Sequence, residues 1–524
     1  MYMLRAAAVF SDNMVLQRDK KIRVFGTGKS GSRIRVTLLN KTAETVCSEG
    51  KWIVYLPEFE AVESAVMEIT DGSTTLRFSN IAIGEVWLAG GQSNMELELQ
   101  NADGGQEILQ NFNSSRKVLR DGAEMSEAIR RVRFYYTPKV AYECEALWEA
   151  EKNSRWELFG KEEAAKWSAV GFFYAVRLAE KLGVTVGIIG CNWGGTSASA
   201  WMSREALLEQ EATKSYVEEY ENSEWVKKSR VEQIKDYDEY VEYHADWERR
   251  AGKIYEENPR ESFDRVQELV GPCRYPGPMN CANFTRPAGL YEVMLRKIAP
   301  YTLRGFLYYQ GESDEHKPKS YYALLTRMMQ QWREDFLDHE LFFLLVQLPM
   351  HQYEGTEDNK SWCMIREAQL KAYENIKNTG LAVIIDCGQF HEIHPRNKQP
   401  VGERLALQAL CQVYHRIGAE EAFGPLYRDF LYRDGGMEIF FRYAKEGFII
   451  KGAVPTGFEI AGEDGVFYPA GAGFTERGDS VFLKAAQVER PLMARYLWTN
   501  YAEVNVFGKN GLPAAPFRTH LFDE

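Results

Sequence analysis

The sequence lacks the features that mark membrane and nucleic-acid-binding proteins. No run of about 18 consecutive apolar residues occurs in its 524 residues, so no membrane-spanning helix is expected. There is no dense block of lysine and arginine, and the net charge is −12, which disfavours nucleic acid and anionic membranes as partners. The first residues show no sustained apolar segment followed by a small-residue cleavage site. We therefore expect a cytoplasmic protein without a signal peptide.

Cysteine pairs and phosphate-binding loops are also missing. The eight cysteines are scattered without a C-x-x-C pair, which disfavours a zinc ribbon or a thioredoxin-type motif and favours reduced thiols. The glycine-rich segments contain neither the P-loop lysine nor the G-x-G-x-x-G pattern.

What is present divides the chain into three predicted domains. Residues 1–80 contain short runs of alternating apolar and polar residues between glycine turns, which predict a small β-sandwich-like module. Residues 81–418 alternate apolar runs with helical stretches. Residues 419–524 return to short strands between glycine-rich turns, which predict a second β-rich module. One possible arrangement is that this second module packs on the N-terminal module. A chain with 45% hydrophobic residues is long enough to fill all three cores.

The middle region is predicted to be a doubly wound α/β domain with a parallel sheet of about five strands. Its apolar runs are nearly continuous, as expected for parallel strands that are buried on both faces. The runs lie at 86–89, 184–189, 303–308, 341–348 and 381–386. Between them, residues 163–181 and 320–336 have the spacing of helices that bury one face.

Residues 205–272 interrupt this alternation with a highly charged segment. Val231, Ile234, Tyr237 and Val241 follow the spacing of one helix face, so the segment is predicted to be a helical insertion. We expect a solvated helical excursion without a catalytic part. A lid or an oligomer contact is the alternative, so a homo-oligomer stays open.

Ser93 stands at the end of the first apolar run. The string Gly-Gly-Gln-Ser-Asn-Met at 90–95 predicts a strand that stops in a tight turn and passes into a helix. A hydroxyl at such a corner is exposed at the carboxyl end of the strand, near helix N–H groups that stabilise negative charge. The pattern indicates a nucleophile, and an ordinary helix N-cap is the alternative.

His394 follows the last predicted strand, in a chain that has only eight histidines. A serine after the first strand and a histidine after the last can meet at one edge of such a sheet. A surface loop histidine is the alternative. His391, Glu392 and His394 also form a short cluster, but its spacing differs from H-E-x-x-H, so a metal site is disfavoured.

Two further loops follow predicted strands. Gly194 and Gly195 allow backbone N–H groups to approach a ligand closely, although a tight turn needs them equally. Gln310, beside Gly311, offers an amide donor to an oxyanion, although an ordinary polar loop residue would look the same.

Five ordered motifs resemble the sialate O-acetylesterase family of SGNH-type carbohydrate esterases. They are GEVWLAGGQSNM, NWGGTSASAWMS, RPAGLYEVMLRKIAPYTLRGFLYYQGESD, IHPRNKQPVGERLAL and GLPAAPFRT, and the start FSDNMVLQRDKKIRVFGTG is similar too. The likeness runs from about residue 8 to 518 and is least in the charged insertion. It implies an SGNH-hydrolase-like fold, no cofactor, and an acetylated saccharide as substrate.

The resemblance also implies roles for individual residues. Ser93 is the nucleophile, and His394 is the general base. The Ser93 N–H, the Gly194 or Gly195 N–H and the Gln310 side chain form the oxyanion hole. SGNH enzymes commonly carry an aspartate three residues before the histidine, but His391 occupies that position here. Glu392, as side chain or carbonyl, is our first candidate for the third catalytic residue, and Asp386 is another.

The substrate within this class stays open. An acetylated sialic acid would require an arginine for its carboxylate, and Arg286, Arg396 and Arg404 lie near the motifs. Acetylated xylan, mannan or xyloglucan oligosaccharides are the other choice. The rival from another class is a catalytically silent carbohydrate-binding protein. A lipase-like hydrolase is disfavoured because no G-x-S-x-G elbow surrounds Ser93.

Overall fold

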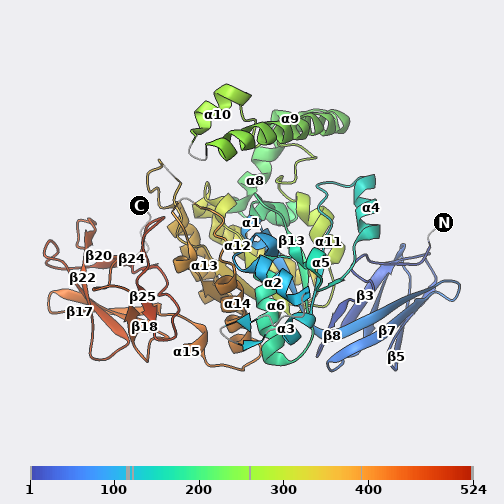
Figure 1. The fold of residues 1–524 in the computed structure, drawn as a ribbon, viewed down its shortest axis with the longest axis horizontal. Coiled ribbons are helices and arrows are strands. Elements are labelled where there is room, and N and C mark those ends of the chain that lie inside the picture. Colours follow the sequence, from blue (N-terminus) through green and yellow to red (C-terminus); the bar gives the residue numbers. More distant parts are fainter. Residues whose placement is uncertain are drawn as a thin grey trace.

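The computed structural model describes residues 3–113, 119–120, 123–124, 126–258, 261–353, 355–390 and 392–520. His391 lies outside the described residues. A large mixed sheet occupies the centre of the molecule, with a β module at each end of the long axis (Figure 1). The central α/β region separates the two β modules. The arrangement in which the C-terminal module packs on the N-terminal module is therefore wrong.

Six neighbouring strands of the central sheet run parallel, and a short antiparallel strand borders them. In spatial order these strands are β12 (Glu157–Leu158), β11 (Val132–Tyr136), β13 (Val186–Asn192), β8 (Thr75–Gly91), β14 (Gly305–Tyr309), β15 (Phe342–Gln347) and β16 (Thr379–Val383). All five predicted runs fall on strands. The prediction missed β11, because its sequence VRFYY contains an arginine and so does not read as an apolar run. Arg133 is nevertheless buried, and its guanidinium donates to the carbonyls of Asn13 and Asn80.

β8 connects the N-terminal module to the central sheet and crosses the predicted domain boundary at residue 80. Its first residues alternate between exposed and half-buried positions and pair antiparallel with β7 (Val62–Thr70). From Ile81 to Gly91 every residue is buried; this half first pairs with β2 (Val15–Gln17) and β7, and from Trp87 onward it runs between β13 and β14. The burial pattern of β8 changes because its first half is covered on one face of the sheet, whereas its second half is covered on both faces.

Helices cover both faces of the parallel sheet. The Trp87 ring of β8 packs on Tyr174 of α6 (Ala169–Leu182), with ring centroids 5.5 Å apart. Gly90 of the same strand lies against Trp332 of α12 (Tyr321–Asp335), whose ring atoms would be 2.8 Å from an added Cβ. Residues 87 and 90 point to opposite faces of a strand, so these two helices lie on opposite sides. Helix α13 (Ser361–Asn375) packs beside α12, and α14 (Gln399–Gln412) beside α6.

The segment predicted as one helix at 163–181 is two. It forms α5 (Lys161–Ala165) and α6, and the Ser168 hydroxyl accepts a hydrogen bond from the Gly171 N–H as the N-cap of α6. The helix predicted at 320–336 is α12. The remaining short elements of the middle region are α1 (Ser93–Glu96), η1 (Leu99–Asn101), α2 (Gly105–Asn113), β9 (Leu119–Arg120), β10 (Ala123–Glu124), α3 (Ser126–Arg130), α4 (Glu145–Asn153), η2 (Ala198–Trp201), η4 (Tyr291–Leu295), α11 (Arg296–Ile298), η5 (Glu312–Asp314), η6 (Pro318–Ser320) and η7 (Ile385–Cys387).

The N-terminal module is built from short β-strands, as predicted. One sheet has the order β1-β3-β6. The other strands join the first half of β8: β2 and β7 pair with β8, β4 pairs with β7, and β5 pairs with β4. The strands are β1 (Arg5–Ala6), β2 (Val15–Gln17), β3 (Ile22–Thr27), β4 (Arg33–Leu38), β5 (Lys41–Val46), β6 (Lys51–Leu56) and β7.

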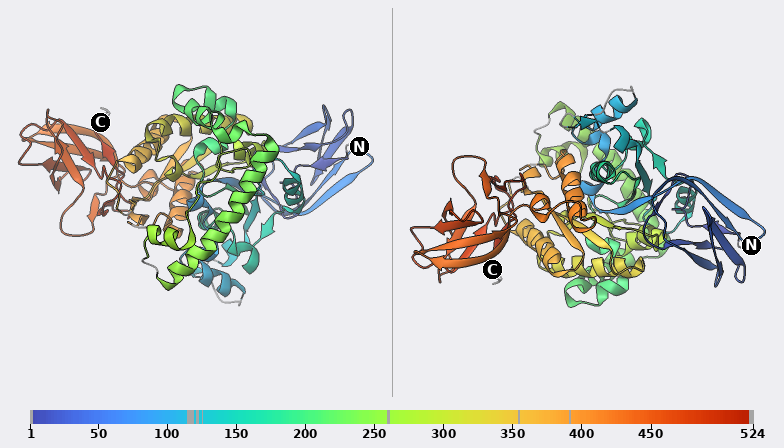
Figure 2. Two further views of the ribbon diagram at one scale, coloured as in Figure 1. Left: turned by 90° about the horizontal axis from the view of Figure 1, so that it is seen from above. Right: turned by 90° about the horizontal axis from the view of Figure 1, so that it is seen from below.

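The charged segment is helical, as predicted, and lies above the sheet edge that carries α1 (Figure 1). It comprises α7 (Arg204–Leu208), α8 (Glu211–Glu221), η3 (Glu224–Lys227), α9 (Arg230–Glu257) and α10 (Phe263–Val270). Seen from above, α9 crosses the middle of the molecule (Figure 2).

The C-terminal module follows α15 (Ala419–Ala422) and contains two four-stranded sheets and a strand pair. Their orders are β17-β18-β23-β22, β21-β20-β24-β26 and β19-β25. The strands are β17 (Leu426–Arg433), β18 (Gly436–Arg442), β19 (Phe448–Ile450), β20 (Phe458–Ala461), β21 (Tyr468–Pro469), β22 (Gly471–Phe474), β23 (Ser480–Lys484), β24 (Met493–Tyr496), β25 (Val506–Gly508) and β26 (Phe517–Arg518). All eight thiols of the chain are free. Within the described ranges, none of the helices has the length and apolarity needed to span a bilayer.

Candidate active site

Ser93 is the first residue of α1, directly after the central strand β8. Gly91 ends the strand with φ +135°, and a Cβ on it would lie 2.1 Å from the Tyr309 carbonyl oxygen of β14. Only glycine permits both this backbone conformation and this approach of the two strands. The chain therefore turns sharply, and Gln92 leads into the helix. The predicted strand-to-helix corner is present.

The structure brings Ser93 and His394 together across 301 residues of sequence. The distance between Ser93 Oγ and His394 Nε2 is 2.7 Å. His394 lies in the loop between η7 and α14, after the last parallel strand. Partial burial lowers the pKa of the His394 imidazole below its ordinary value of 6.5; the Glu392 carboxylate raises this pKa, and the nearby Lys398 charge lowers it further. The ring is therefore neutral near pH 7 and can accept a proton.

No candidate carboxylate that the structure describes is within hydrogen-bond distance of the other ring nitrogen. Glu392 Oε1 is 4.0 Å from His394 Nδ1 and instead accepts a hydrogen bond from the His394 backbone N–H at 2.8 Å. The Asp386 carboxylate forms a two-pronged ion pair with the Arg404 guanidinium, at 2.5 and 2.8 Å. Asp386 is thus committed elsewhere, while Glu392 lies close enough to act on the ring through its charge.

Asn94, the residue after the serine, ties the histidine loop to the helix of the nucleophile. Its buried side-chain amide donates to the Ile393 carbonyl at 2.9 Å and to Glu312 Oε1 at 2.6 Å. Its carbonyl oxygen accepts from the Lys398 ammonium at 2.5 Å. The sequence alone assigns no role to Asn94, Glu312 or Lys398, although each lies inside one of the motifs quoted above.

Asn94 thereby joins two buried charges of opposite sign. Burial lowers the pKa of the Lys398 ammonium to about 8 and raises the pKa of the Glu312 carboxyl. Each charge partly offsets the effect of burial on the pKa of the other. A buried, hydrogen-bonded network of this kind holds one geometry, because leaving any member unpaired carries a desolvation cost.

Of the predicted oxyanion donors, the backbone of Ser93 and Gly195 remains suitable. As the first residue of α1, Ser93 has an N–H that the helix itself cannot pair, and Gly195 occupies the neighbouring turn with φ +71°. The Gly194 N–H is different: it donates to Glu96 Oε2 at 2.5 Å, and Glu96 in turn pairs with Lys139. The interpretation of Gly194 as a donor is therefore corrected, since its proton is already used within the protein.

The Gln310 side chain does not reach toward the serine as an oxyanion donor. It is buried, and its amide nitrogen donates to Asp314 Oδ2 at 2.6 Å, with the Thr196 carbonyl and Gln92 Oε1 each at 3.3 Å. Its oxygen accepts from the Tyr321 hydroxyl at 2.9 Å. This prediction is corrected too: Gln310 holds the loops beneath the site together.

The three arginines considered for a substrate carboxylate all have partners in the protein. Arg286 pairs with Glu292 at 3.0 Å, Arg404 pairs with Asp386, and Arg396 donates to the Asn101 carbonyl at 2.8 Å. No group of three or more His, Cys, Asp or Glu side chains suited to a metal ion occurs in the part of the chain that the structure describes. His391, a member of the short His/Glu cluster, falls outside that part.

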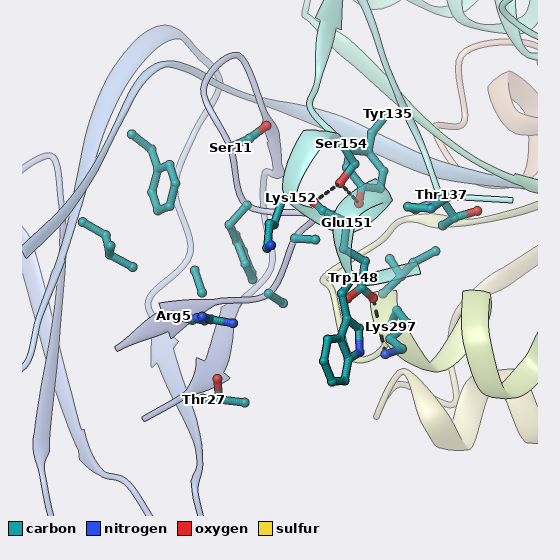
Figure 3. A pocket seen from close by; sticks show the side chains of 18 of the residues that line it. Arg5, Ser11, Thr27, Tyr135, Thr137, Trp148, Glu151, Lys152, Ser154 and Lys297 are labelled. Carbon is teal, nitrogen blue, oxygen red and sulfur yellow. Dashed lines mark hydrogen bonds and ion pairs between the residues drawn. The ribbon is translucent and has the colours of Figure 1, made fainter. Parts of the chain in front are cut away.

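A cleft of about 790 Å³ lies away from Ser93, between the N-terminal module and helices α4 and α11 (Figure 3). Arg5 and Thr27 line one side, while Trp148 and Lys297 line the other. None of the predicted site residues lines it. The chemistry expected from the sequence therefore belongs to the sheet edge and not to this cleft.

Comparison with known proteins finds similarity to acetylesterases. Residues 268–411 match the family model described as carbohydrate esterase, sialic acid-specific acetylesterase. Sialate O-acetylesterase from Mus musculus is 26% identical over 445 residues, which cover 78% of this chain and 73% of that protein. The Homo sapiens protein of that name is 24% identical over 440 residues, with coverages of 78% and 71%. The crystal structure of a carbohydrate acetylesterase from Xanthomonas citri has a TM-score of 0.74 and 26% identity, and covers 99% of this chain and 100% of that one.

Proposed function

We propose that this carboxylic ester hydrolase, which is related to the sialate O-acetylesterases, removes acetyl groups from sugar hydroxyls by a serine mechanism on an SGNH-type fold. The observation that carries the proposal is the 2.7 Å contact between Ser93 Oγ and His394 Nε2. A hydroxyl that close to a neutral imidazole is activated as a nucleophile.

The reaction has two acyl-transfer steps. Ser93 Oγ attacks the acetyl carbonyl carbon, and His394 Nε2 takes the serine proton. The tetrahedral intermediate collapses, the bond from carbon to the sugar oxygen breaks, and His394 returns the proton to that oxygen. Water, deprotonated by His394, then attacks the acetyl-serine. Acetate leaves, and Ser93 regains its proton.

The oxyanion is stabilised by backbone donors at the end of the sheet. The Ser93 and Gly195 N–H groups are the two we assign, and each such donor is worth about 3 kcal/mol of activation free energy. Ser93 is also at the positive end of α1, although the four-residue helix contributes only through these local N–H groups.

Glu392 acts as a charge near the imidazole rather than as a full member of a triad. The 4.0 Å separation is too long for a hydrogen bond to Nδ1, but a negative charge at this distance favours the imidazolium that forms in each step. The working unit is thus a Ser93–His394 dyad assisted by Glu392.

The proposed substrates are acetylated saccharides. A sialic acid and a plant oligosaccharide of the xylan, mannan or xyloglucan type are the two candidates. Arg286 and Arg404 are paired with carboxylates, whereas Arg396 is exposed, lies two residues from His394 and donates through Nε alone to the Asn101 carbonyl. Arg396 is therefore the candidate for a substrate carboxylate, and both substrate classes belong in the test. Acetate release from a panel of acetylated xylo-, manno- and xyloglucan oligosaccharides and acetylated sialic acids tests the proposal. Saccharide binding without acetate release from any of them would favour the silent binding protein instead.

A further inference from the structure

The helical insertion reaches down to the catalytic edge through the loop at residues 271–277, which we call the Tyr275 loop. This loop follows α10 and is fastened to α9. The Trp247 indole N–H donates to the Gly271 carbonyl at 2.7 Å, and the Tyr243 hydroxyl donates to the Pro272 carbonyl at 2.6 Å. The insertion and its loop therefore form one packed unit rather than a loose excursion.

Two more contacts fix the direction of the Tyr275 loop. The Arg274 guanidinium lies over the Tyr243 ring, 3.8 Å from its centroid. Gly277 has φ +76° and is so close to Tyr240 that an added Cβ would be 2.5 Å from the ring. A side chain at this position would displace the loop from α9.

Tyr275 lies at the tip of this loop, beside the turn that packs on the nucleophile. Its hydroxyl oxygen is 3.7 Å from the position that a Cβ on Gly195 would take. On the other side of the same turn, a Cβ on Gly194 would lie 3.2 Å from Ser93 Cβ. One glycine turn thus separates the Tyr275 phenol from the reacting serine.

The Tyr275 side chain is 61% exposed, although the backbone around it is well anchored. Its ring neighbour is His244, at a centroid distance of 6.0 Å. A tyrosine that served only to stabilise the insertion would bury its ring. An anchored loop that leaves a phenol exposed beside a nucleophile is typical of a ligand contact, since such a ring binds by both its apolar face and its hydroxyl.

A pair of aromatic side chains borders the same glycine turn. Trp193, next to the glycine turn, stacks on Phe284 with ring centroids 4.7 Å apart and planes at 9°.

We propose that Tyr275 binds the sugar ring that carries the acetyl group, so that the helical insertion forms part of the saccharide site. This inference rests on the proposed function. A pyranose presents a C–H face to an aromatic ring and hydroxyls to a phenol oxygen, and a small aryl ester without the sugar needs neither contact. Tyr275 therefore discriminates saccharide esters from simple esters.

The test compares two substrates on Tyr275→Ala and Tyr275→Phe. For an acetylated xylo-oligosaccharide we expect Tyr275→Ala to raise KM about tenfold with little change in kcat, as loss of an aromatic contact predicts. For p-nitrophenyl acetate we expect kcat/KM within about twofold of the wild type. Tyr275→Phe keeps the ring and separates stacking from hydrogen bonding. Trp225→Ala is the matched control, because Trp225 belongs to the same insertion and is 41% exposed.

The outcomes separate this inference from the proposed function. An active wild type whose saccharide KM is unchanged in Tyr275→Ala overturns the inference alone. Equal losses on both substrates together with a lower Tm also overturn it, because they indicate a structural role. A wild type that hydrolyses p-nitrophenyl acetate but no acetylated saccharide overturns the proposed function and this inference with it.

Discussion

The two halves of the catalytic pair are held in different ways. Ser93 follows the fully buried half of β8. The turn before it is fixed by Gly91, whose positive φ and close approach to Tyr309 only glycine permits. His394 lies in a loop, with a side chain that is 44% exposed. Two hydrogen bonds hold the backbone at this point. The Asn94 amide donates to the Ile393 carbonyl, and the His394 N–H donates to the Glu392 carboxylate. The nucleophile is therefore positioned by the sheet, whereas the base is positioned by single polar contacts.

Replacing Ser93 removes the half that the sheet holds and should have the largest effect. Ser93→Ala is expected to abolish hydrolysis of p-nitrophenyl acetate, because no other hydroxyl is assigned to the attack. The Tm should be unchanged within a few degrees, since within the described part of the chain Ser93 Oγ hydrogen-bonds only to His394. Acetate release and thermal unfolding, measured on the same sample, check both statements. Retained turnover would refute the nucleophile assignment.

Replacing His394 removes the half that the loop holds. His394→Ala should lower kcat by about 10³-fold or more, on the scale of losses of a general base. Steady-state kinetics with p-nitrophenyl acetate measures this. If the loss were mild, His391 would become the candidate base.

Releasing the loop without touching the reacting atoms should have an intermediate effect. Asn94→Ala removes a hydrogen bond from the Ile393 carbonyl and from each of the two buried charges, Lys398 and Glu312. Losing about 1–3 kcal/mol of positioning in this way predicts a loss of about 10- to 100-fold in kcat. Asn375→Ala is the control, because among the described residues this amide at the end of α13 donates one exposed hydrogen bond, to the Tyr322 hydroxyl of α12. Equal activities of the two variants would show that the Asn94 contacts do not position His394.

The charge beside the imidazole should matter less. Glu392→Gln is expected to lower kcat less than tenfold, because the carboxylate is half exposed and makes no hydrogen bond to the ring. A collapse as large as that of His394→Ala would instead make Glu392 a full triad member.

The smallest effect is a shift of the acid limb of the pH profile. Activity requires neutral His394, so kcat/KM should fall as the pH drops through the pKa of the free enzyme. Burial lowers this pKa, so the midpoint is expected below 6.5. Glu392 raises the pKa, and Glu392→Gln should therefore move the midpoint to still lower pH. A midpoint above 6.5, or a shift upward in the variant, would contradict the assigned electrostatics.

The same contrast explains which features the sequence predicts. Continuous apolar runs identify the parallel strands, and the turn residues after β8 identify Ser93, because both are local properties of the chain. Strand β11 escapes prediction because the buried Arg133 guanidinium is hydrogen-bonded by carbonyls from distant segments. A local pattern contains no information about such partners.

Errors in the oxyanion assignment have the same origin. Gln310 and Gly194 have the right residue type after the right strands, but contacts within the protein occupy their N–H groups. Gly194 donates to the distant Glu96, and the Gln310 amide donates to Asp314 four residues on and to Thr196 and Gln92 from distant segments. The network of Asn94, Lys398 and Glu312 unites three motifs that are 86 to 304 residues apart, so only the fold reveals it. The motifs indicate where chemistry occurs, and the contacts decide which atoms are free for it.

Covalent labelling tests the paired action of Ser93 and His394 most directly. The wild type is treated with diisopropyl fluorophosphate, which modifies serines that an adjacent base activates, and the adduct is located by peptide mass spectrometry. The account predicts a single adduct on Ser93 that is lost in His394→Ala. An adduct on another residue, or labelling of Ser93 that does not depend on His394, would contradict it.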